Sequence, residues 1–277
     1  MKKLFIYLFS AILVLCAVIF IINFSVKKDI RKTQADVQDY WPAGSWRTSS
    51  PEEQGMDSGV LANMIDSIRE SGKSVNSITI IRNGYLVNET YFYPYQKNIK
   101  HSLNSCTKGV VSALVGVAMD EGRIKSVNDN ISKYFPGLEI ANTDKRKQDM
   151  KIKNLMTMST GLNWEFSGNV STNQMLQSQD WTRFVLDQPM LEKPGSTFNY
   201  CNGAAHVVSA IVQKSMGKNP ADLAAKKLKI GIKDMYWSSS PENVSMGYSG
   251  IYMEPDDMAR FGYLYLKKGN WNCKNVF

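Results

Sequence analysis

The sequence is poor in the residues that hold metal ions. Its 277 residues include only two histidines, His101 and His206, and four cysteines, of which Cys16 lies in an apolar N-terminal run. These residues make no recognisable metal-ligand spacing, such as the paired Cys and His of zinc sites. The sequence therefore predicts no metal site and no other cofactor.

The chain also lacks the signature of a nucleic-acid-binding protein, although it is basic. Of the net charge of +8, +5 belongs to residues 1–32, which hold six Lys and Arg against the single acid Asp29. The rest of the chain carries only +3 and no nucleic-acid-binding motif. We therefore expect the basic N-terminal residues to contact anionic lipid headgroups, and we expect no nucleic-acid partner.

The run Leu4 to Phe24 contains no charged residue and is mostly apolar. It is long enough to span a bilayer, which takes about 20 residues. No small-x-small cleavage site follows it, and the residue before Cys16 is Leu15, where lipoprotein processing would need a small residue. Residues 1–32 are therefore predicted to form an uncleaved, single-pass anchor in the cell membrane, with the following domain on the extracytoplasmic side.

A polar linker, residues 33–50, is expected to follow and to dock its aromatic residues Trp41 and Trp46 on a domain that covers 51–277. Apolar periodicity predicts a helix at 57–71, and the apolar segment 203–216 is predicted to form another. The sequence Asn83-Gly84 predicts a hairpin that joins strands 77–82 and 85–92. Between about 123 and 200, an all-α subdomain is predicted from short helical segments at 128–134, 152–158, 172–176 and 181–186.

The most informative pattern is Ser105-Cys106-Thr107-Lys108, which opens the apolar run 110–119. Residues three apart on a helix share a face, so Ser105 and Lys108 can form a nucleophile beside its base. The positive end of the helix would favour a serine alkoxide and an oxyanion. Ser-x-x-Lys is a short pattern that recurs at Ser25 and Ser215, but only the copy at Ser105 begins a long apolar helix.

A second candidate lies in the loop 191–202, which ends in Tyr200-Cys201-Asn202 just before the helix predicted at 203–216. A loop that presents Tyr200 and Asn202 before a buried helix is more typical of a functional site than of a core. The alternative is an ordinary turn with a surface aromatic residue.

Together, five segments in this order resemble the serine beta-lactamase-related family: 105–108, 153–162, 194–200, 200–202 and 250–260. That family includes class C beta-lactamases, D,D-carboxypeptidases, esterases and amide hydrolases. The resemblance implies an α/β (α+β) fold of the beta-lactamase/transpeptidase type, with helices packed on an antiparallel sheet plus the all-α subdomain. It also implies a serine hydrolase that acts through an acyl-enzyme on a beta-lactam, D-amino-acid peptide, ester or small amide. The substrate would be a small molecule or a peptidoglycan-type compound, and the oligomeric state stays open.

The resemblance also implies roles for individual residues. Ser105 would be the acylated nucleophile, and its backbone N–H would form half of the oxyanion hole. Lys108 would be the neighbouring base, which requires that burial favour its neutral form. Tyr200 would share the proton transfer and protonate the leaving group, and Asn202 would hold the substrate amide or orient Lys108.

One family segment is lacking, namely Lys or His, any residue, then Gly, on a strand after the helices. The candidate Lys267-Lys268-Gly269 follows a helix expected at 258–266 and is interpreted as its C-terminal cap. The sequence thus predicts a chain truncated before the later strands, with an exposed hairpin edge and poorly covered apolar residues at 78–92 and 110–119. The alternative function is a catalytically weak penicillin-binding or sensor module, or a gene fragment.

Cys106 and Cys201 fall inside two of these family segments and are expected near the site. A disulfide between them is one alternative outside the cytoplasm, and two free, buried thiols are the preferred interpretation.

Overall fold

The computed structural model describes residues 40–228, 230–232 and 234–277. The chain divides after Trp41, and Pro42–Phe277 form the compact unit described below. The predicted anchor Leu4–Phe24 and most of the predicted linker lie outside the described residues. Within the described ranges, no helix is both long and apolar enough to cross a membrane.

The first part of this unit is a helix and a two-stranded hairpin, which follow a 3₁₀ turn at Glu52–Gln54 (η1). Helix α2 spans Ser58–Glu70, and the Asp57 side chain caps it by accepting a hydrogen bond from the backbone N–H of Val60. Strands β1 (Ser77–Arg82) and β2 (Tyr85–Tyr91) pair antiparallel. Asn83 and Gly84 join them with φ of 51° and 81°, which Asn and Gly tolerate best. The predicted helix and hairpin are therefore confirmed.

The hairpin is thinly covered, as expected. Among the described residues β1 pairs only with β2, and no residue of β1 is buried. Leu86 and Val87 of β2 are buried. The segment before η1 docks as predicted for its second tryptophan, because Trp46 is buried and its ring meets Tyr263 edge-on at 5.5 Å between centroids.

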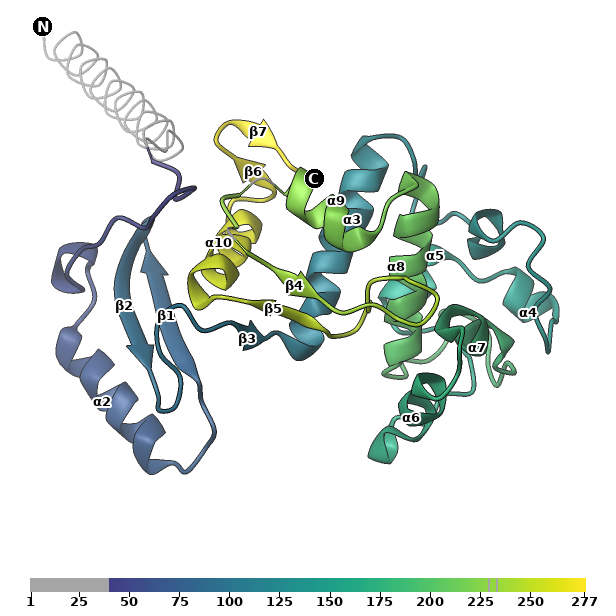
Figure 1. Ribbon diagram of the computed structural model, residues 1–277, viewed down its shortest axis with the longest axis horizontal. Helices are drawn as coiled ribbons and strands as arrows, with labels where there is room; N and C mark the ends of the chain where they lie inside the picture. The colour runs from purple at the N-terminus through teal and green to yellow at the C-terminus, as the bar shows by residue number, and fades with distance from the viewer. Residues whose placement is uncertain (1–39, 229, 233) are drawn as a thin grey trace, which may run out of the picture. The chain divides into compact units, whose positions relative to one another are not determined.

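The core lies around helix α3 (Thr107–Asp120), which packs against α8 (Asn202–Met216) and α9 (Pro220–Lys227) (Figure 1). The expectation that residues 110–119 would be poorly covered is wrong, since Met119 alone among their apolar side chains is exposed. The physical reason is that α8 and α9 cover the helix. Phe277 also lies against it, because a Cβ added at Gly116 would come within 2.9 Å of the Phe277 Cβ.

Between residues 123 and 200 the named elements are all helical, as the sequence predicts. They are η3 (Ile131–Tyr134), α4 (Lys145–Gln148), α5 (Ile152–Met156), η4 (Ser167–Asn169), α6 (Val170–Leu176) and α7 (Trp181–Asp187). The single turn α4, capped by Asp144, was not predicted. Because α5, α6 and α7 all contact α8, this helical region and α3 share one central helix.

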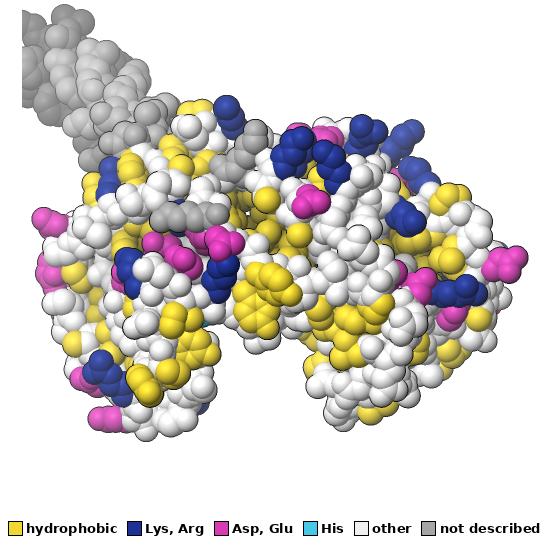
Figure 2. Space-filling model, in the orientation of Figure 1, with side chains coloured by type: hydrophobic (Ala, Val, Ile, Leu, Met, Phe, Trp, Pro, Cys, Tyr) yellow, Lys and Arg dark blue, Asp and Glu magenta, His cyan; other side chains and the backbone are white. Residues whose placement is uncertain are grey.

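A second sheet has the strand order β3-β5-β4, formed by His101–Ser102, Ile251–Met253 and Tyr236–Trp237. Tyr236 and Tyr252 are exposed on it, and Figure 2 shows hydrophobic side chains at the surface over β4 and β5. Because β3 runs into the turn that carries Ser105, this sheet fixes where α3 begins.

The chain then continues through α10 (Pro255–Leu266) into a small hairpin of β6 (Asn270–Trp271) and β7 (Lys274–Asn275). Lys267 ends α10, and Gly269 follows with φ of 79°. The interpretation of Lys267-Lys268-Gly269 as a helix end is therefore confirmed. Taken together, the helices and small antiparallel sheets confirm the predicted α/β (α+β) class.

Candidate active site

Ser105 lies at the junction between β3 and α3. The backbone N–H of Leu103 donates to the carbonyl of Ile251 at 2.9 Å, which ties this junction to β5. Residues Asn104–Cys106 then form a 3₁₀ turn (η2), and α3 begins at Thr107. Ser105 is therefore exposed just before the helix, and Lys108 follows in its first turn.

The amine of Lys108 is the centre of the site. Its Nζ lies within hydrogen-bond distance of four oxygens: Ser105 Oγ at 3.0 Å, Tyr200 Oη at 2.9 Å, Asn202 Oδ1 at 3.0 Å and the Tyr248 carbonyl at 3.1 Å. An ammonium group has only three hydrogens to donate. At most three of these four contacts can therefore be donated by Lys108 at once, and the Ser105 and Tyr200 hydroxyl groups lie where a base beside a nucleophile would need them.

The loop before α8 brings Tyr200 and Asn202 to Lys108. Cys201 is the N-cap of α8, and its Sγ accepts a hydrogen bond from the backbone N–H of Ala204 at 3.2 Å. Asn202 is the first residue of the helix and Tyr200 immediately precedes the cap. As a result, Tyr200 Oη lies 2.7 Å from Ser105 Oγ. All four residues predicted from the sequence therefore meet at one point.

The hydroxyl group of Tyr200 is electrostatically prepared to lose its proton. Burial is the largest single influence and raises its pKa. Hydrogen bonds from Lys108 and Ser105, together with the positive charge of Lys108, outweigh burial and hold the pKa of Tyr200 below the ordinary value for tyrosine. A tyrosine in this environment can act as a base.

Two residues that the sequence did not reveal complete the wall of the site. The amide Nδ2 of Asn202 donates to Thr172 Oγ1 at 3.2 Å, so Asn202 keeps its Oδ1 toward Lys108. The ring of Phe166 lies 4.6 Å from the Tyr200 ring, between centroids, and is partly exposed. Phe166 immediately precedes the turn η4, and Thr172 lies on α6. This segment contains no recognisable motif.

The carbonyl of Tyr248 is a third contribution that sequence reasoning missed. It accepts from Lys108 through the backbone, so no side-chain pattern announces it. Its position two residues before the 250–260 segment was the only available signal.

The sequence also contains the other Ser-x-x-Lys copies and the two cysteines expected near the site. Ser215 does not face Lys218, because its hydroxyl group donates to the Val212 carbonyl in the last turn of α8; the copy at Ser25 lies outside the described residues. Cys106 and Cys201 are free thiols, as preferred, but Cys106 is exposed and only Cys201 is buried. Burial raises the pKa of the Cys201 thiol to about 12.

No group of three or more potential ligands that could hold a metal ion occurs among the described residues.

Comparison with known proteins identifies the family to which these features belong. Residues 61–272 match the family model Beta-lactamase. The chain is also 28% identical over 146 residues to Protein flp of Staphylococcus aureus strain MRSA252, and this match covers 50% of the chain and 29% of that protein. The aligned part therefore spans less than a third of the curated relative.

Solved structures show the same fold. A protein assigned as a 6-aminohexanoate-dimer hydrolase from Bacillus anthracis superposes with a TM-score of 0.64 at 21% identity, over 76% of this chain and 59% of that one. The octameric penicillin-binding protein homologue from Pyrococcus abyssi superposes with a TM-score of 0.58 at 19% identity, over 78% and 57% of the two chains. At these identities the likeness concerns the fold alone.

Proposed function

Because the chain belongs to the beta-lactamase family, whose members are serine hydrolases, we propose that it is a hydrolase that works through an acyl-enzyme on Ser105. The observation that carries this proposal is that Lys108 Nζ contacts both Ser105 Oγ and Tyr200 Oη, which also contact each other. Two groups that can exchange protons, Lys108 Nζ and Tyr200 Oη, thus lie beside one exposed nucleophile.

The geometry supports a simple proton path. Ser105 Oγ attacks the substrate carbonyl carbon while its proton passes to Tyr200 Oη or to Lys108. The bond from that carbon to the leaving group breaks, and Tyr200 returns a proton to the departing oxygen or nitrogen. Water then attacks the acylated serine by the same path in reverse, which releases the acid and restores the Ser105 hydroxyl group. Asn202 and the Tyr248 carbonyl keep Lys108 aimed at this centre throughout.

The proposed substrates are a beta-lactam, a D-amino-acid peptide, an ester or a small amide, including compounds of the peptidoglycan type. The family and the exposed position of Ser105 support this range. We also propose that the run Leu4–Phe24 anchors the chain in the cell membrane with the catalytic domain outside the cytoplasm; its length, its apolar composition and the basic residues around it support this. Protease added to intact cells should then remove the domain, and full protection would contradict this topology.

A second function, a weak penicillin-binding or sensor module, is favoured by one specific observation. The sequence Lys267-Lys268-Gly269 ends α10 and so does not supply a strand beside Ser105. Such a module would be acylated by a reactive substrate but would turn over slowly.

The test is covalent labelling followed by turnover. The full chain should be labelled by a fluorescent penicillin or a fluorophosphonate, and Ser105→Ala should abolish the label while Ser215→Ala keeps it. Steady hydrolysis of a chromogenic ester that depends on Ser105 would support the hydrolase over the binding module. Label retained on the Ser105→Ala protein would contradict both.

A further inference from the structure

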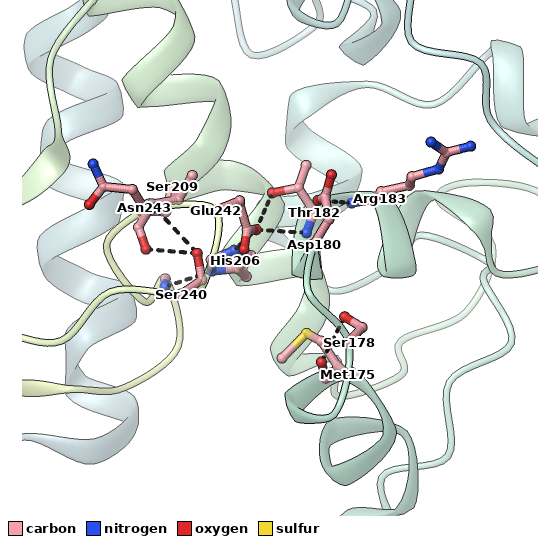
Figure 3. Close-up of polar contacts among 12 residues, drawn as sticks. Met175, Ser178, Asp180, Thr182, Arg183, His206, Ser209, Ser240, Glu242 and Asn243 are labelled. Carbon is pink, nitrogen blue, oxygen red and sulfur yellow. Dashed lines mark hydrogen bonds and ion pairs between the residues drawn. The ribbon is translucent and has the colours of Figure 1, made fainter.

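A buried histidine lies behind the site, on the opposite side of the Tyr248 segment. His206 of α8 is fully buried, and its Nε2 lies 3.0 Å from Glu242 Oε1 (Figure 3). The same carboxylate oxygen accepts hydrogen bonds from the backbone N–H and the hydroxyl group of Thr182, at 3.0 and 3.2 Å. Glu242 thus joins His206 to the first turn of α7.

The other ring nitrogen faces the active site. The backbone N–H of Gly247 donates to His206 Nδ1, with 3.5 Å between the two nitrogen atoms. The next residue is Tyr248, whose carbonyl accepts from Lys108 at 3.1 Å. A hydrogen bond to His206 therefore stands one residue away from a hydrogen bond that orients the catalytic amine.

The backbone at Gly247 approaches α8 unusually closely. A Cβ added there would lie 2.0 Å from the carbonyl oxygen of Ala205, so only glycine fits. Gly247 and Lys108 also line a mostly apolar cavity of about 60 Å³. The segment that carries Tyr248 is therefore held tightly against α8, at the edge of a small cavity that α8 also lines.

The contacts select one tautomer of His206. Burial is the largest influence on the Glu242 carboxyl group and raises its pKa. Hydrogen bonds from His206, from the backbone N–H of Glu242, from Ser240 and from Thr182 together outweigh burial and lower the pKa of Glu242 to about 2. The carboxylate is thus ionised at all ordinary pH values and needs a donor at Nε2. Nδ1 is then the acceptor that Gly247 requires, and a second proton on the ring would place two N–H groups against each other.

We propose that His206 is a positioning residue whose neutral form holds the Tyr248 carbonyl against Lys108, and whose protonation at Nδ1 releases that carbonyl and slows acylation. This inference rests on the proposed function of Ser105 and Lys108. It adds a pH-dependent step that involves neither residue's own titration.

The neighbours of His206 do not themselves account for the proposed pH dependence. From the 238–250 segment it faces Glu242, which stays ionised, and from α7 it faces the ring of Trp181 at 5.3 Å between centroids. Tyr248 packs on Trp181, and burial raises its pKa to about 12, so it stays neutral. Asp180 caps α7 through the backbone N–H of Arg183.

The experiment uses two substitutions that each keep one half of the ring's hydrogen bonding. In His206→Asn the side-chain oxygen can take the place of Nδ1 and accept from Gly247, and the amide carries no titratable group. In His206→Gln the amide reaches toward Glu242 but leaves Gly247 without its acceptor. Acylation of Ser105 by a fluorescent penicillin is followed from acidic to alkaline pH in the full chain and in both variants.

Nitrogen NMR of labelled histidine supplies the second readout. The chain has only two histidines, so the spectrum of His206→Asn assigns both. We expect the Nε2–H tautomer for the neutral ring of His206, and a step in the acylation rate at the midpoint of its NMR titration. His206→Asn should keep the neutral-pH rate and lose that step, whereas His206→Gln should be slower by about fivefold to tenfold, the effect of one hydrogen bond.

Several outcomes would overturn the proposal. These are an Nδ1–H tautomer of the neutral ring, an unchanged step in the acylation rate of His206→Asn, or equal rates for the two variants. If wild-type Ser105 is acylated and one of these results is found, only the role of His206 fails. If wild-type Ser105 is not acylated at all, the proposed function fails and the role of His206 fails with it.

Discussion

Helix α8 and helix α2 bury their residues to very different extents. Eleven of the fifteen residues of α8 are buried, whereas none of the thirteen residues of α2 is, and all of both helices are described. Both helices are expected from the sequence, α2 from its apolar periodicity and α8 from its apolar composition, and α8 is covered on several sides by α3, α5, α7 and α9. The mostly apolar sequence of α8 agrees with its burial on several sides, whereas the single apolar stripe of α2 agrees with one partly covered face.

This difference in burial matters for function, because the site residues lie on the helices that pack around α8. Lys108 lies on α3, Asn202 on α8 and Thr172 on α6. These helices pack together, so the distances among the polar groups are set by close-packed side chains rather than by the thinly covered hairpin. Changes in the helical region should therefore affect catalysis and stability, and changes around α2 should affect stability only slightly.

The largest expected effect is on catalysis, from Tyr200→Phe. Removing the hydroxyl group deletes the group that exchanges a proton with Ser105, so the acylation rate should fall by about 10² to 10⁴. The wild-type rate should rise with pH as Tyr200 ionises, with a midpoint below that of an ordinary tyrosine, and this rise should disappear in the variant. Tyr252→Phe on β5, an exposed tyrosine, is the matched control and should keep the wild-type rate and profile.

Cavity formation provides the next test of the comparison. Ile211 is fully buried in α8 and Ile65 is half-buried on α2, so Ile211→Ala should lower the free energy of unfolding by about 2–5 kcal/mol. Ile65→Ala should cost about 1 kcal/mol, since its site opens to solvent. Denaturant titration of both variants measures the difference. Equal losses would show that α2 is packed as firmly as α8.

The sequence predicts those site residues that are separated by one helical turn or that lie at the N-terminus of a helix. Ser105 and Lys108 are three residues apart, and Tyr200 and Asn202 precede a long apolar helix, so local rules suffice for them. Thr172, Phe166 and the Tyr248 carbonyl reach the site only through tertiary packing, and one of them acts through its backbone. No local pattern distinguishes such residues from ordinary turn and helix residues.

The fold shows the same division between local and long-range information. The strands of β1 and β2 carry a clear turn signal at Asn83-Gly84, whereas β3, β4 and β5 have only two or three residues each and are too short for periodicity. The error over residues 110–119 has the same origin, because the contacts of α3 with α9 and Phe277 join segments far apart in the chain.

A smaller effect is expected from Thr172→Val, which keeps the shape of the side chain but removes the acceptor for Asn202 Nδ2. A buried amide donor without a partner costs about 1–3 kcal/mol, so both the stability and the orientation of Asn202 should suffer. We expect a lower acylation rate with little change in substrate affinity, measured as a kcat effect. Thr172→Ser retains the hydroxyl group and should restore the rate; failure to do so would mean that packing, and not the hydrogen bond, is what matters.

The smallest effect is expected from matched helix caps in the two regions. Asp57 caps α2 and Asp180 caps α7, each by accepting from the backbone N–H three residues on, at 3.1 and 2.8 Å. Replacing either by Ala should cost about 1 kcal/mol, which is about fivefold in local opening. Because α7 packs on α8 and α2 has no buried residue, Asp180→Ala should speed amide hydrogen exchange in both α7 and α8. Asp57→Ala should speed it in α2 alone. Mass spectrometry of exchanged peptides measures both effects. Faster exchange of α8 in Asp57→Ala would show that the two regions open together, which would contradict the separation inferred from their different burial.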